Sequence, residues 1–475
     1  MNEHVMLAQA CPHPSQTRRQ LVCVQGLGFV GSAMAIAIAN ARGPGGPFYD
    51  VVGVDLPTEA GRHRVASIAE GRLPFAGADK MLGHALAEAH AAGNLTATCN
   101  PEIFKEANVV VVDINLDIDW SAPQPIVHFD ALQRAVDDLG QRLRPGSLII
   151  VETTVPPGTC ERVLAPRLAA SLRTRGLPDS AILLAHSYER VMPGADYYSS
   201  IVNYWRVYAG TTSEAADACE YFLSNVINVA EYPLTRLASP TASETAKVLE
   251  NSFRAVNIAF MEEWGRFAEA VGIDLFDIVE AVRKRPTHAN IRQPGFGVGG
   301  YCLTKDPLFG VVAARAIFSR PDLAFPFSSE AVRTNAAMPL LALAKVRERL
   351  GGSLKGSRIL LLGVSYREDV GDTRYSPAQV FVEAAEREGA EVTTHDPLVT
   401  YWPELDRPVE SELPPAKMFD AVVFTQAAPS YRAIELGEWL RGSAAEVIDA
   451  NNVLTREQRR SVSATGCSCT SIGRG

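Results

Sequence analysis

The sequence has little that would place the protein in a membrane, outside the cell or on nucleic acid. Its 475 residues contain no apolar run that approaches the ~20 residues of a membrane-spanning helix. Residues 1–20 lack the basic-then-apolar order of a signal peptide. The formal net charge of -9 argues against an overall nucleic-acid-binding surface. We therefore expect a cytoplasmic protein with neither a membrane nor a nucleic-acid partner.

Cysteine is also scarce. The eight cysteines are scattered along the chain, which is not the pattern of a disulfide framework. Cys467 and Cys469 have no histidine or further cysteine close by, so we expect no metal site there. The hydrophobic content of 47% supports sizeable buried cores. At roughly 150 residues per domain, the length suggests about three folded units.

The first half of the chain opens with the pattern of a dinucleotide-binding unit. Residues 21–25 are typical of a short buried strand, and a helix-forming run rich in alanine and isoleucine begins at residue 32. The turn between them reads Gly26-Leu-Gly28-Phe29-Val30-Gly31. Gly26 would permit the tight turn, Gly28 the approach of a pyrophosphate and Gly31 close packing of the helix. The start of the helix would attract phosphate, so we predict that this turn binds a dinucleotide.

A second apolar run, residues 51–54, ends at Asp55. A carboxylate at this place hydrogen-bonds the ribose hydroxyls of NAD and repels the additional phosphate of NADP. No arginine directly follows Asp55, and the insertion of residues 42–47 accounts for its late position. A solvated carboxylate at a strand end is the alternative. After the glycine turn, we favour binding of NAD.

Three further apolar runs predict strands of the same parallel sheet, at residues 109–112, 148–151 and 181–185. Ligands of open α/β sheets bind beyond the carboxyl ends of the strands. Thr154 follows the second of these runs, and Glu189 and Arg190 follow the third, so they are candidates for the site. Threonines that shape a loop, or a surface ion pair, would explain the same residues without a ligand.

Residues 243–271 contain no proline and one glycine, and their apolar residues recur at helical spacing, which predicts one long helix. Glu244, Lys247 and Asn251 are three and four residues apart and therefore share one face. These side chains could face an active site, but spacing alone favours an exposed polar stripe. The apolar residues beyond the stripe indicate an interface with a second copy of the chain.

The segment 293–307 concentrates groups that could carry out covalent chemistry. Four of the six residues from 295 to 300 are glycine, Gly299 among them, so the backbone can bend freely and approach a ligand. Cys302 follows, with Lys305 and Asp306 close behind. The nucleophile is the thiolate, which a nearby cation favours. Taken alone, the segment favours a glycine-rich turn with a buried structural cysteine, and only the rest of the chain shifts the balance toward a covalent site.

The last part of the chain predicts a second α/β unit. Apolar runs indicate strands at residues 358–364, 391–394, 421–424 and 446–449, after a helix at residues 337–350. No GxGxxG follows the first of these strands, so we do not expect NAD there. The charged loop 365–377 instead offers Arg367 and Arg374 to a phosphate-bearing substrate. The Ser/Gly-rich end, residues 456–475, is expected to be disordered.

Taken in order, six segments resemble motifs of the nucleotide-sugar 6-dehydrogenases, the family that oxidises UDP-glucose, GDP-mannose and UDP-N-acetylhexosamines. These segments are Gly26–Gly31, Thr153–Thr159, Glu189–Gly194, Glu244–Asn251, Gly299–Asp306 and Asp372–Pro377. The resemblance implies an α/β fold, with two Rossmann-like parallel-sheet domains joined by a long central helix and a helical middle domain. The implied units are an NAD-binding domain (20–235), a helical dimerisation domain with the cysteine loop (236–335) and a nucleotide-sugar-binding domain (336–455).

The resemblance also implies the chemistry, a four-electron oxidation of the sugar C6 alcohol to a carboxylate with two NAD used in turn. Cys302 would form a thiohemiacetal with the C6 aldehyde, and its oxidation would give a thioester for water to cleave. Lys247 would stabilise the oxyanions, while Asp306 and a water held by Thr154 would transfer protons. The other implied contacts are those of Lys305 and Thr154 with the cofactor, and those of Lys247, Asn251, Glu189, Arg190, Gly299 and Arg374 with the nucleotide sugar.

The sequence departs from the family pattern at residues 113–116, where many members have Val-Pro-Thr-Pro. The Glu189–Gly194 segment, with Pro193, resembles the N-acetylhexosamine branch, so we expect a UDP-N-acetylhexosamine as substrate and UDP-glucose as the next candidate. A two-electron dehydrogenase of the hydroxyacid type is one alternative, and it would not need Cys302. A non-catalytic protein that binds NAD or a nucleotide sugar is another.

Overall fold

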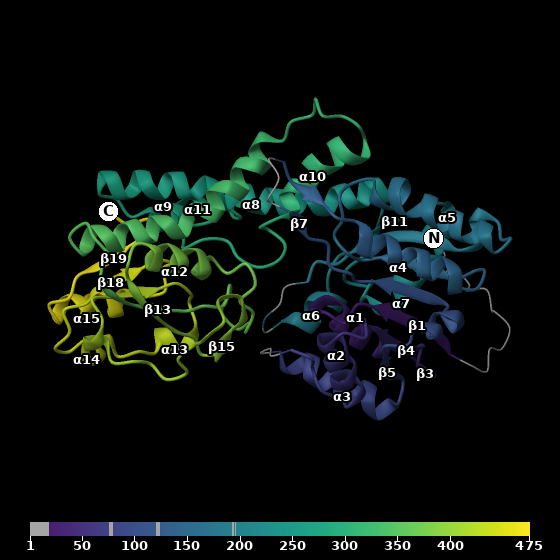
Figure 1. The fold of residues 1–475 in the computed structure, drawn as a ribbon, viewed down its shortest axis with the longest axis horizontal. Helices are drawn as coiled ribbons and strands as arrows, with labels where there is room; N and C mark the ends of the chain where they lie inside the picture. Colours follow the sequence, from purple (N-terminus) through teal and green to yellow (C-terminus); the bar gives the residue numbers. More distant parts are fainter. Residues whose placement is uncertain (1–18, 76–78, 120–123, 192–193, 195) are drawn as a thin grey trace, which may run out of the picture.

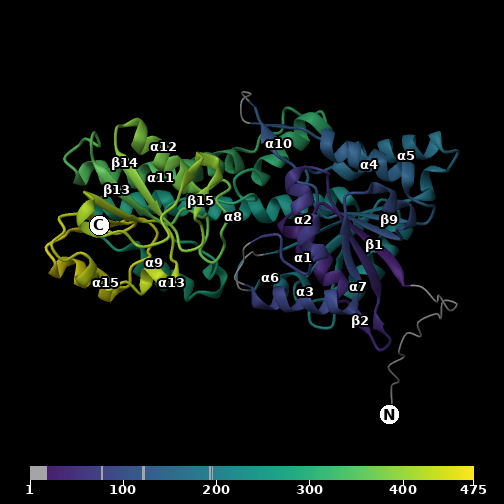
Figure 2. The same cartoon turned by 60° about the horizontal axis from the view of Figure 1, so that its bottom comes forward.

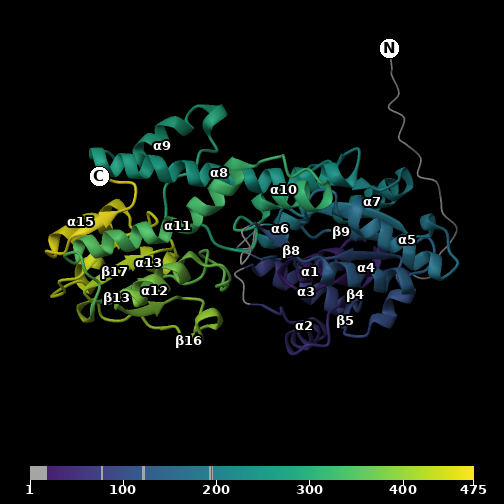
Figure 3. The ribbon, with the colours of Figure 1, turned by 45° about the horizontal axis from the view of Figure 1, so that its top comes forward.

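The computed structural model describes residues 19–75, 79–119, 124–191, 194 and 196–475. Two sheets, one mostly and one entirely parallel, lie at opposite ends of an elongated molecule, and helix α8 (Pro240–Val271) runs from one lobe to the other (Figure 1). The same two lobes stay separate along the long axis in the turned views (Figure 2, Figure 3). The predicted α/β fold, with two sheets joined by a long helix, is confirmed.

Within the described residues, the N-terminal sheet has eight strands in the order β12-β11-β10-β9-β6-β1-β4-β5. Their bounds are β1 (Gln20–Gln25), β4 (Tyr49–Val54), β5 (Leu95–Thr98), β6 (Val109–Val112), β9 (Leu148–Val151), β10 (Leu183–Tyr188), β11 (Val207–Gly210) and β12 (Thr235–Arg236). Neighbouring strands are parallel, except that β10 and β11 are antiparallel. Gln25 pairs with Val112, and Val112 with Val151, so the residues that follow these strands meet at one edge.

Helices cover both faces of this sheet, so its strands are buried on both sides. Along β1, Val22 and Val24 pack in one cluster with side chains of α1, α3 and α7, whereas Cys23 packs in the opposite cluster with α4 and α5. The helices are α1 (Phe29–Ala39), α2 (Glu59–Ala69), α3 (Lys80–Ala92), α4 (Asp130–Arg142), α5 (Ala165–Thr174), α6 (Tyr197–Val202) and α7 (Ser213–Val226). The predicted bounds 181–185 are wrong, since β10 continues through Tyr188.

The C-terminal sheet is parallel throughout, with the order β14-β13-β17-β18-β19. Its strands are β13 (Arg358–Leu362), β14 (Glu391–His395), β17 (Ala421–Phe424), β18 (Glu446–Asp449) and β19 (Cys469–Ser471). Its helices are α12 (Pro377–Arg387), α13 (Pro429–Arg432), α14 (Leu436–Trp439) and α15 (Arg456–Ala464). Short hairpins pair β2 (Arg42–Gly43) with β3 (Gly46–Pro47), β7 (Ile118–Asp119) with β8 (Ile126–Val127), and β15 (Tyr401–Trp402) with β16 (Arg407–Pro408).

The helical middle of the chain comprises α8, α9 (Leu275–Arg283), α10 (Phe309–Val312) and α11 (Pro326–Arg349). Ser239 caps α8 by accepting a hydrogen bond from Ala242 N, and Gly272 ends it with a φ of 77°. The predicted helix start at residue 337 is wrong, because α11 begins at Pro326. The predicted domain division between residues 335 and 336 therefore falls inside a continuous helix.

The C-terminal end is folded, so the prediction of disorder for residues 456–475 is wrong. Helix α15 starts with a capping box between Thr455 and Gln458, and β19 extends the sheet beside β18. The last residues then reach the middle of the chain. Arg474 forms an ion pair with Asp274 at 2.7 Å, and Gly475 N donates to the carbonyl of Ile273 at 3.1 Å.

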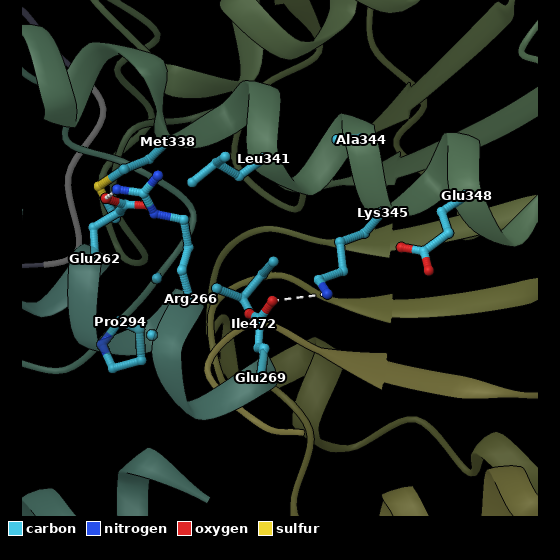
Figure 4. Close-up of a pocket in the computed structure, with 12 residues that line it drawn as sticks. Glu262, Arg266, Glu269, Pro294, Met338, Leu341, Ala344, Lys345, Glu348 and Ile472 are labelled. Carbon is cyan, nitrogen blue, oxygen red and sulfur yellow. Dashed lines mark hydrogen bonds and ion pairs between the residues drawn. The ribbon is translucent and has the colours of Figure 1, made fainter. Parts of the chain in front are cut away.

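A pocket of ≈ 230 Å³ lies where α8, α11 and Ile472, near the end of the chain, meet (Figure 4). Charged side chains on its wall form ion pairs, Lys345 with Glu269 and Arg266 with Glu262, each at 2.7 Å. None of the predicted site residues lines this pocket. Across the described ranges, no helix could cross a membrane and no cluster of metal-binding side chains could hold an ion. The cytoplasmic location stays a prediction.

Candidate active site

The glycine turn after β1 fits a dinucleotide. Gly26 has a φ of +98°, and a Cβ on it would lie 2.3 Å from the carbonyl oxygen of Asp113. A Cβ on Gly31 would lie 1.9 Å from the carbonyl oxygen of Gly26, whereas a Cβ on Gly28 would meet nothing within 4 Å. Helix α1 begins at Phe29, and its N-cap residue Gly28 has no side chain that could cap it. The space over Gly28 and the free N–H groups of the helix suit a pyrophosphate.

Asp55 follows β4 and is surrounded by donors. Leu27 N donates to its Oδ2 at 3.0 Å, and Leu56 N donates to its Oδ1 at 2.7 Å. Arg64 of α2 forms a two-pronged contact with the same carboxylate, at 2.8 and 3.2 Å. Burial opposes ionisation of Asp55, but these donors outweigh it and hold the pKa of the carboxyl below its ordinary value. The acidic residue expected at the ribose position is therefore ionised and held rigidly.

The polar stripe of α8 faces the interior, so the interpretation as an exposed stripe is wrong. Glu244, Lys247 and Asn251 are all buried. Lys247 Nζ donates to the backbone carbonyl of Glu189 at 2.7 Å and lies 3.2 Å from its Oε1. Asn251 Nδ2 donates to Asp306 Oδ2 at 2.8 Å. The long helix thus joins the residues after β10 to the cysteine segment.

Electrostatic coupling connects the thiol to the same cluster. Cys302 is exposed as a residue, yet the surrounding protein desolvates its sulfur and, together with Asp306, raises the pKa of the thiol to about 11. Lys247 and Lys305 act in the opposite direction, because cations favour the thiolate. Burial lowers the pKa of Lys247, but Glu189, Cys302 and Asp306 outweigh this and raise it. The resting cluster therefore holds a protonated thiol and a charged lysine at neutral pH.

Lys305 is only 3% exposed, and its ammonium has partners within the protein. Its Nζ lies 2.7 Å from Asp306 Oδ1 and 4.4 Å from the ring centroid of Tyr301. The ring centroid of Phe309 lies 4.6 Å from the same nitrogen. Lys305 therefore counterbalances the charge of Asp306, and its predicted contact with the cofactor stays a prediction.

Two further candidates, Arg190 and Thr154, follow strand ends of the N-terminal sheet. Arg190 donates to Glu250, to the hydroxyl of Tyr188 and to the carbonyl of Trp205, so its guanidinium anchors the loop after β10 to α8. Thr154 is half-buried just beyond β9. Met192 and Pro193 of the Glu189–Gly194 segment lie outside the described residues.

The cysteine segment lies against the C-terminal domain. A Cβ on Gly299 would lie 2.5 Å from Tyr366 Cβ and 2.8 Å from Pro377 Cδ, so a larger residue would push the two apart. Arg374 forms an ion pair with Asp372 at 2.7 Å. The guanidinium carbon of Arg374 also lies 5.2 Å from the ring centroid of Phe29, in the glycine turn. The contact between the lobes thus brings predicted cofactor-binding and substrate-binding residues together.

Sequence reasoning missed a buried charged cluster beneath the glycine turn. Arg206 and Glu152 form an ion pair and are 1% and 2% exposed. Burial, followed by the proximity of Glu152, raises the pKa of Asp113 well above its ordinary value. Asp113 Oδ2 and Glu152 Oε2 have no hydrogen-bond partner within the described part of the chain. The departure from the family pattern at Asp113 was the one signal, and nothing in the sequence pointed to Arg206.

Glu244 has a structural role that its helical spacing could not show. Its carboxyl group accepts hydrogen bonds from Gly158 N at 2.5 Å and from Cys160 N at 2.8 Å. Burial raises the pKa of Glu244 to about 7. The Glu244 side chain therefore attaches the loop that contains Thr154 to the first turns of α8.

Comparison with known protein families gives three matches along the chain. Residues 20–225 match the NAD binding domain of the UDP-glucose/GDP-mannose dehydrogenase family, residues 241–336 its central domain and residues 360–456 its UDP binding domain. The chain belongs to this family. The resemblance of the six segments is confirmed, and the protein is an NAD-dependent nucleotide-sugar dehydrogenase with a UDP-binding domain. The hydroxyacid-type and non-catalytic alternatives are thereby set aside.

Relatives match this dehydrogenase over nearly their whole length. The UDP-N-acetyl-D-mannosamine dehydrogenase of Pyrococcus horikoshii is 30% identical over 91% of this chain and 96% of its own. That of Methanocaldococcus jannaschii is 29% identical over 92% and 93%. The structure of the UDP-D-ManNAc dehydrogenase from Pyrococcus horikoshii has a TM-score of 0.81 at 28% identity, covering 96% of this chain and 100% of that one. The NDP-N-acetyl-D-galactosaminuronic acid dehydrogenase from Methanosarcina mazei has a TM-score of 0.77 at 26% identity, with 96% of each chain covered.

Proposed function

We propose that this dehydrogenase oxidises the C6 alcohol of a UDP-N-acetylhexosamine to the carboxylate in two successive NAD-dependent steps. The observation that carries the two-step chemistry is the coupling of Cys302 with Lys247 and Asp306 in one cluster. UDP-N-acetyl-D-mannosamine is the first candidate substrate, because two relatives of that name match over nearly their whole length. UDP-glucose is the second.

The proposed reaction uses Cys302 to make the second oxidation possible. The chemistry that NAD supplies when bound is acceptance of a hydride at each step. Loss of a hydride and the hydroxyl proton converts the C6 alcohol to an aldehyde, and Sγ of Cys302 adds to its carbon while the oxygen gains a proton. The resulting thiohemiacetal again has a hydroxyl and a C–H, so a second hydride and proton can leave to give a thioester. Water then attacks the thioester carbon, the C–S bond breaks, and the carboxylate and the free thiol are released.

The buried groups around the thiol supply charge and proton transfer in this proposal. Lys247, charged and held by Glu189, stabilises the negative oxygen that develops in each step. Because the thiol pKa is about 11, its proton must leave as sulfur attacks, and Asp306 is the neighbouring base for it. Asn251 holds Asp306 in place, and Thr154 is assigned to the water that cleaves the thioester.

The nucleotide sugar in this proposal spans the junction between the two lobes. Residues 360–456 match a UDP binding domain, and Arg374 of that region lies over Phe29 of the glycine turn. A guanidinium suits a diphosphate because it can donate two parallel hydrogen bonds. Glu189, Arg190, Asn251 and Gly299 are assigned to the sugar side, since Glu189 lies near Cys302, Arg190 follows Glu189, Asn251 binds Asp306 and Gly299 belongs to the cysteine segment.

We also propose that the dehydrogenase works as a homodimer joined through α8. The helix exposes large apolar side chains at intervals of three, four and seven residues, which places them along one stripe: Leu249 (66% exposed), Phe253 (54%), Phe260 (48%), Trp264 (45%) and Phe267 (51%). The rings of Trp264 and Phe267 pack edge to face at 5.7 Å. A continuous aromatic stripe on a single helix suits a second copy of the same helix, because a two-fold interface uses one patch twice.

A substrate comparison tests the proposed reaction. The purified chain is assayed with NAD and, in turn, UDP-N-acetyl-D-mannosamine, UDP-N-acetyl-D-glucosamine, UDP-glucose and GDP-mannose. We expect the highest kcat/KM with UDP-N-acetyl-D-mannosamine and two NADH for each sugar consumed. A preference for GDP-mannose would contradict the substrate assignment, and one NADH per sugar with release of aldehyde would contradict the two-step chemistry.

A further inference from the structure

We propose that Asp117 is a positioning residue that clasps the two lobes together around the active site. Asp117 lies on the NAD-binding side, directly before β7. Tyr301, immediately before Cys302, donates its hydroxyl to Oδ1 of Asp117. Tyr375, next to Arg374 in the C-terminal domain, donates to the same oxygen at 3.4 Å. We call Asp117, Tyr301 and Tyr375 the clasp.

The clasp connects the parts of the molecule that must act together during turnover. The two tyrosine rings pack edge to face with centroids 5.8 Å apart. The guanidinium carbon of Arg374 lies 5.8 Å from the ring centroid of Tyr301 and 5.2 Å from that of Phe29 in the glycine turn. One carboxylate oxygen therefore links the NAD-binding domain, the cysteine segment and the predicted diphosphate contact.

The backbone of Tyr375 supports this interpretation. Its φ of 53° lies in the left-handed region, which side-chain-bearing residues rarely adopt. Such a conformation persists where surrounding contacts hold it and is concentrated at ligand clamps and switch regions. Here the left-handed conformation belongs to Tyr375, whose hydroxyl reaches Asp117 in the other lobe. The strained backbone and the hydrogen bond of the clasp are therefore in the same residue.

The tyrosines can act as hydrogen-bond donors over the whole working range of pH. Burial, followed by the contact with Asp117, raises the pKa of Tyr301 above its ordinary value. The same two causes raise the pKa of Tyr375. Both hydroxyls thus keep their protons, and hydrogen bonds from a neutral hydroxyl to a carboxylate are stronger than those between neutral groups.

The exposure of the clasp suits a contact that opens and closes. Asp117 is exposed and Tyr375 is 41% exposed, so water can replace their hydrogen bonds when the lobes separate. A substrate held between Arg374 and Cys302 needs such an opening to enter and a closed state to react. By favouring the closed state, the clasp would raise the apparent affinity for the nucleotide sugar without touching it.

The test measures binding without turnover, in a Cys302→Ala background, so it does not depend on the proposed covalent step. UDP is titrated by calorimetry in the presence of saturating NADH. We expect Asp117→Asn to weaken UDP binding by about tenfold, because a charge-assisted contact is lost, and to leave NADH binding and Tm unchanged. Asp119→Asn is the matched control, since Asp119 lies two residues away and faces His128 of its own domain, and it should bind UDP normally.

A double-mutant cycle completes the test. Tyr375→Phe should weaken UDP binding in an otherwise intact clasp but cause little further loss once Asp117 is changed to Asn, because both changes remove the same hydrogen bond. Equal UDP affinity in Asp117→Asn and Asp119→Asn would overturn the clasp. So would a loss of NADH binding in Asp117→Asn, which would show local damage to the NAD-binding domain instead.

Discussion

Asn251 donates a hydrogen bond to Asp306, with 2.8 Å between Nδ2 and Oδ2. Asn251 comes from the long helix and Asp306 from the segment that carries Cys302, and the two residues are 4% and 1% exposed. Lys305 occupies the other oxygen of the carboxyl group at 2.7 Å. Both oxygens of Asp306 therefore have a buried donor, which fixes the proposed base relative to the thiol.

Replacing Asn251 with aspartate tests this relationship. Asn251→Asp keeps the shape but puts a second carboxyl group beside Asp306, where burial already raises the pKa of Asp306. An ionised pair at this position should cost about 3–5 kcal/mol of stability and lower kcat by at least about 100-fold. The loss should grow from pH 5 to pH 8 as the added group ionises, measured by urea unfolding at both pH values. Asn251→Ala, which adds no charge, should show no such pH dependence, and wild-type stability of Asn251→Asp at pH 8 would contradict the prediction.

The second prediction concerns Arg64 and the choice between NAD and NADP. Arg64 pairs with Asp55 and so offsets part of the charge that repels the phosphate of NADP. We expect wild type to prefer NAD. Arg64→Ala should raise the ratio of kcat/KM for NAD over NADP by about fivefold, an effect of the size that loss of a partly exposed ion pair produces. Arg62→Ala is the control, because Arg62 donates to the carbonyl of Pro57 and not to Asp55. An unchanged ratio in Arg64→Ala would show that the pair does not set cofactor choice.

The third prediction concerns the aromatic stripe of α8. Trp264→Glu places a charge in the centre of the proposed dimer interface, where it would be buried without a partner. We expect the variant to elute and scatter light as a monomer at concentrations where wild type is a dimer, with NADH binding retained. Glu263→Gln, at the exposed neighbouring position, should leave the dimer intact. A wild-type protein that is active as a stable monomer would refute the dimer itself.

The sequence predicted those features that local rules determine. The strand, glycine turn and helix at residues 20–39 follow from the conformations that glycine permits, and they were predicted within three residues of the observed bounds. Spacing alone placed Lys247 and Asn251 on one face. It could not decide whether that face is buried, since burial depends on elements 58 and 55 residues away in the chain.

The errors have equally specific causes. The helix predicted to start at residue 337 begins at Pro326 instead, because proline is favoured at the first position of a helix. The tail looked disordered because its composition is polar. Its strand β19 forms by pairing with β18, where Cys469 lies opposite Val447, and composition does not encode such a contact. Arg64 and Arg206 find their carboxylate partners through tertiary folding, so neither ion pair could be read from the sequence.

The fourth prediction concerns Cys302, and its first part is a matter of pH. The thiol has a raised pKa of about 11, so the reactive thiolate is scarce at neutral pH and its fraction grows as pH rises toward that value. Alkylation of Cys302 by iodoacetamide, followed by intact-mass spectrometry, should therefore accelerate between pH 7 and pH 10. Lys247→Met removes a cation that lowers the thiol pKa, so it should slow alkylation at every pH in this range. Rapid alkylation that does not vary with pH would contradict this assignment.

The second part decides whether Cys302 forms the covalent intermediate. A free aldehyde has no hydroxyl beside its C–H, so the second hydride can leave only after a nucleophile has added to the carbon. Wild type should give two NADH per sugar without free aldehyde. Cys302→Ser should lose steady-state turnover, because a hydroxyl is far less acidic than a thiol of reference pKa about 8.5 and an ester hydrolyses more slowly than a thioester. This variant should retain a sugar adduct visible by mass spectrometry, whereas Cys302→Ala should form none. If Cys302→Ala still produced two NADH per sugar at a near-normal rate, the cysteine would be structural, and water addition to the aldehyde would have to replace the thiohemiacetal.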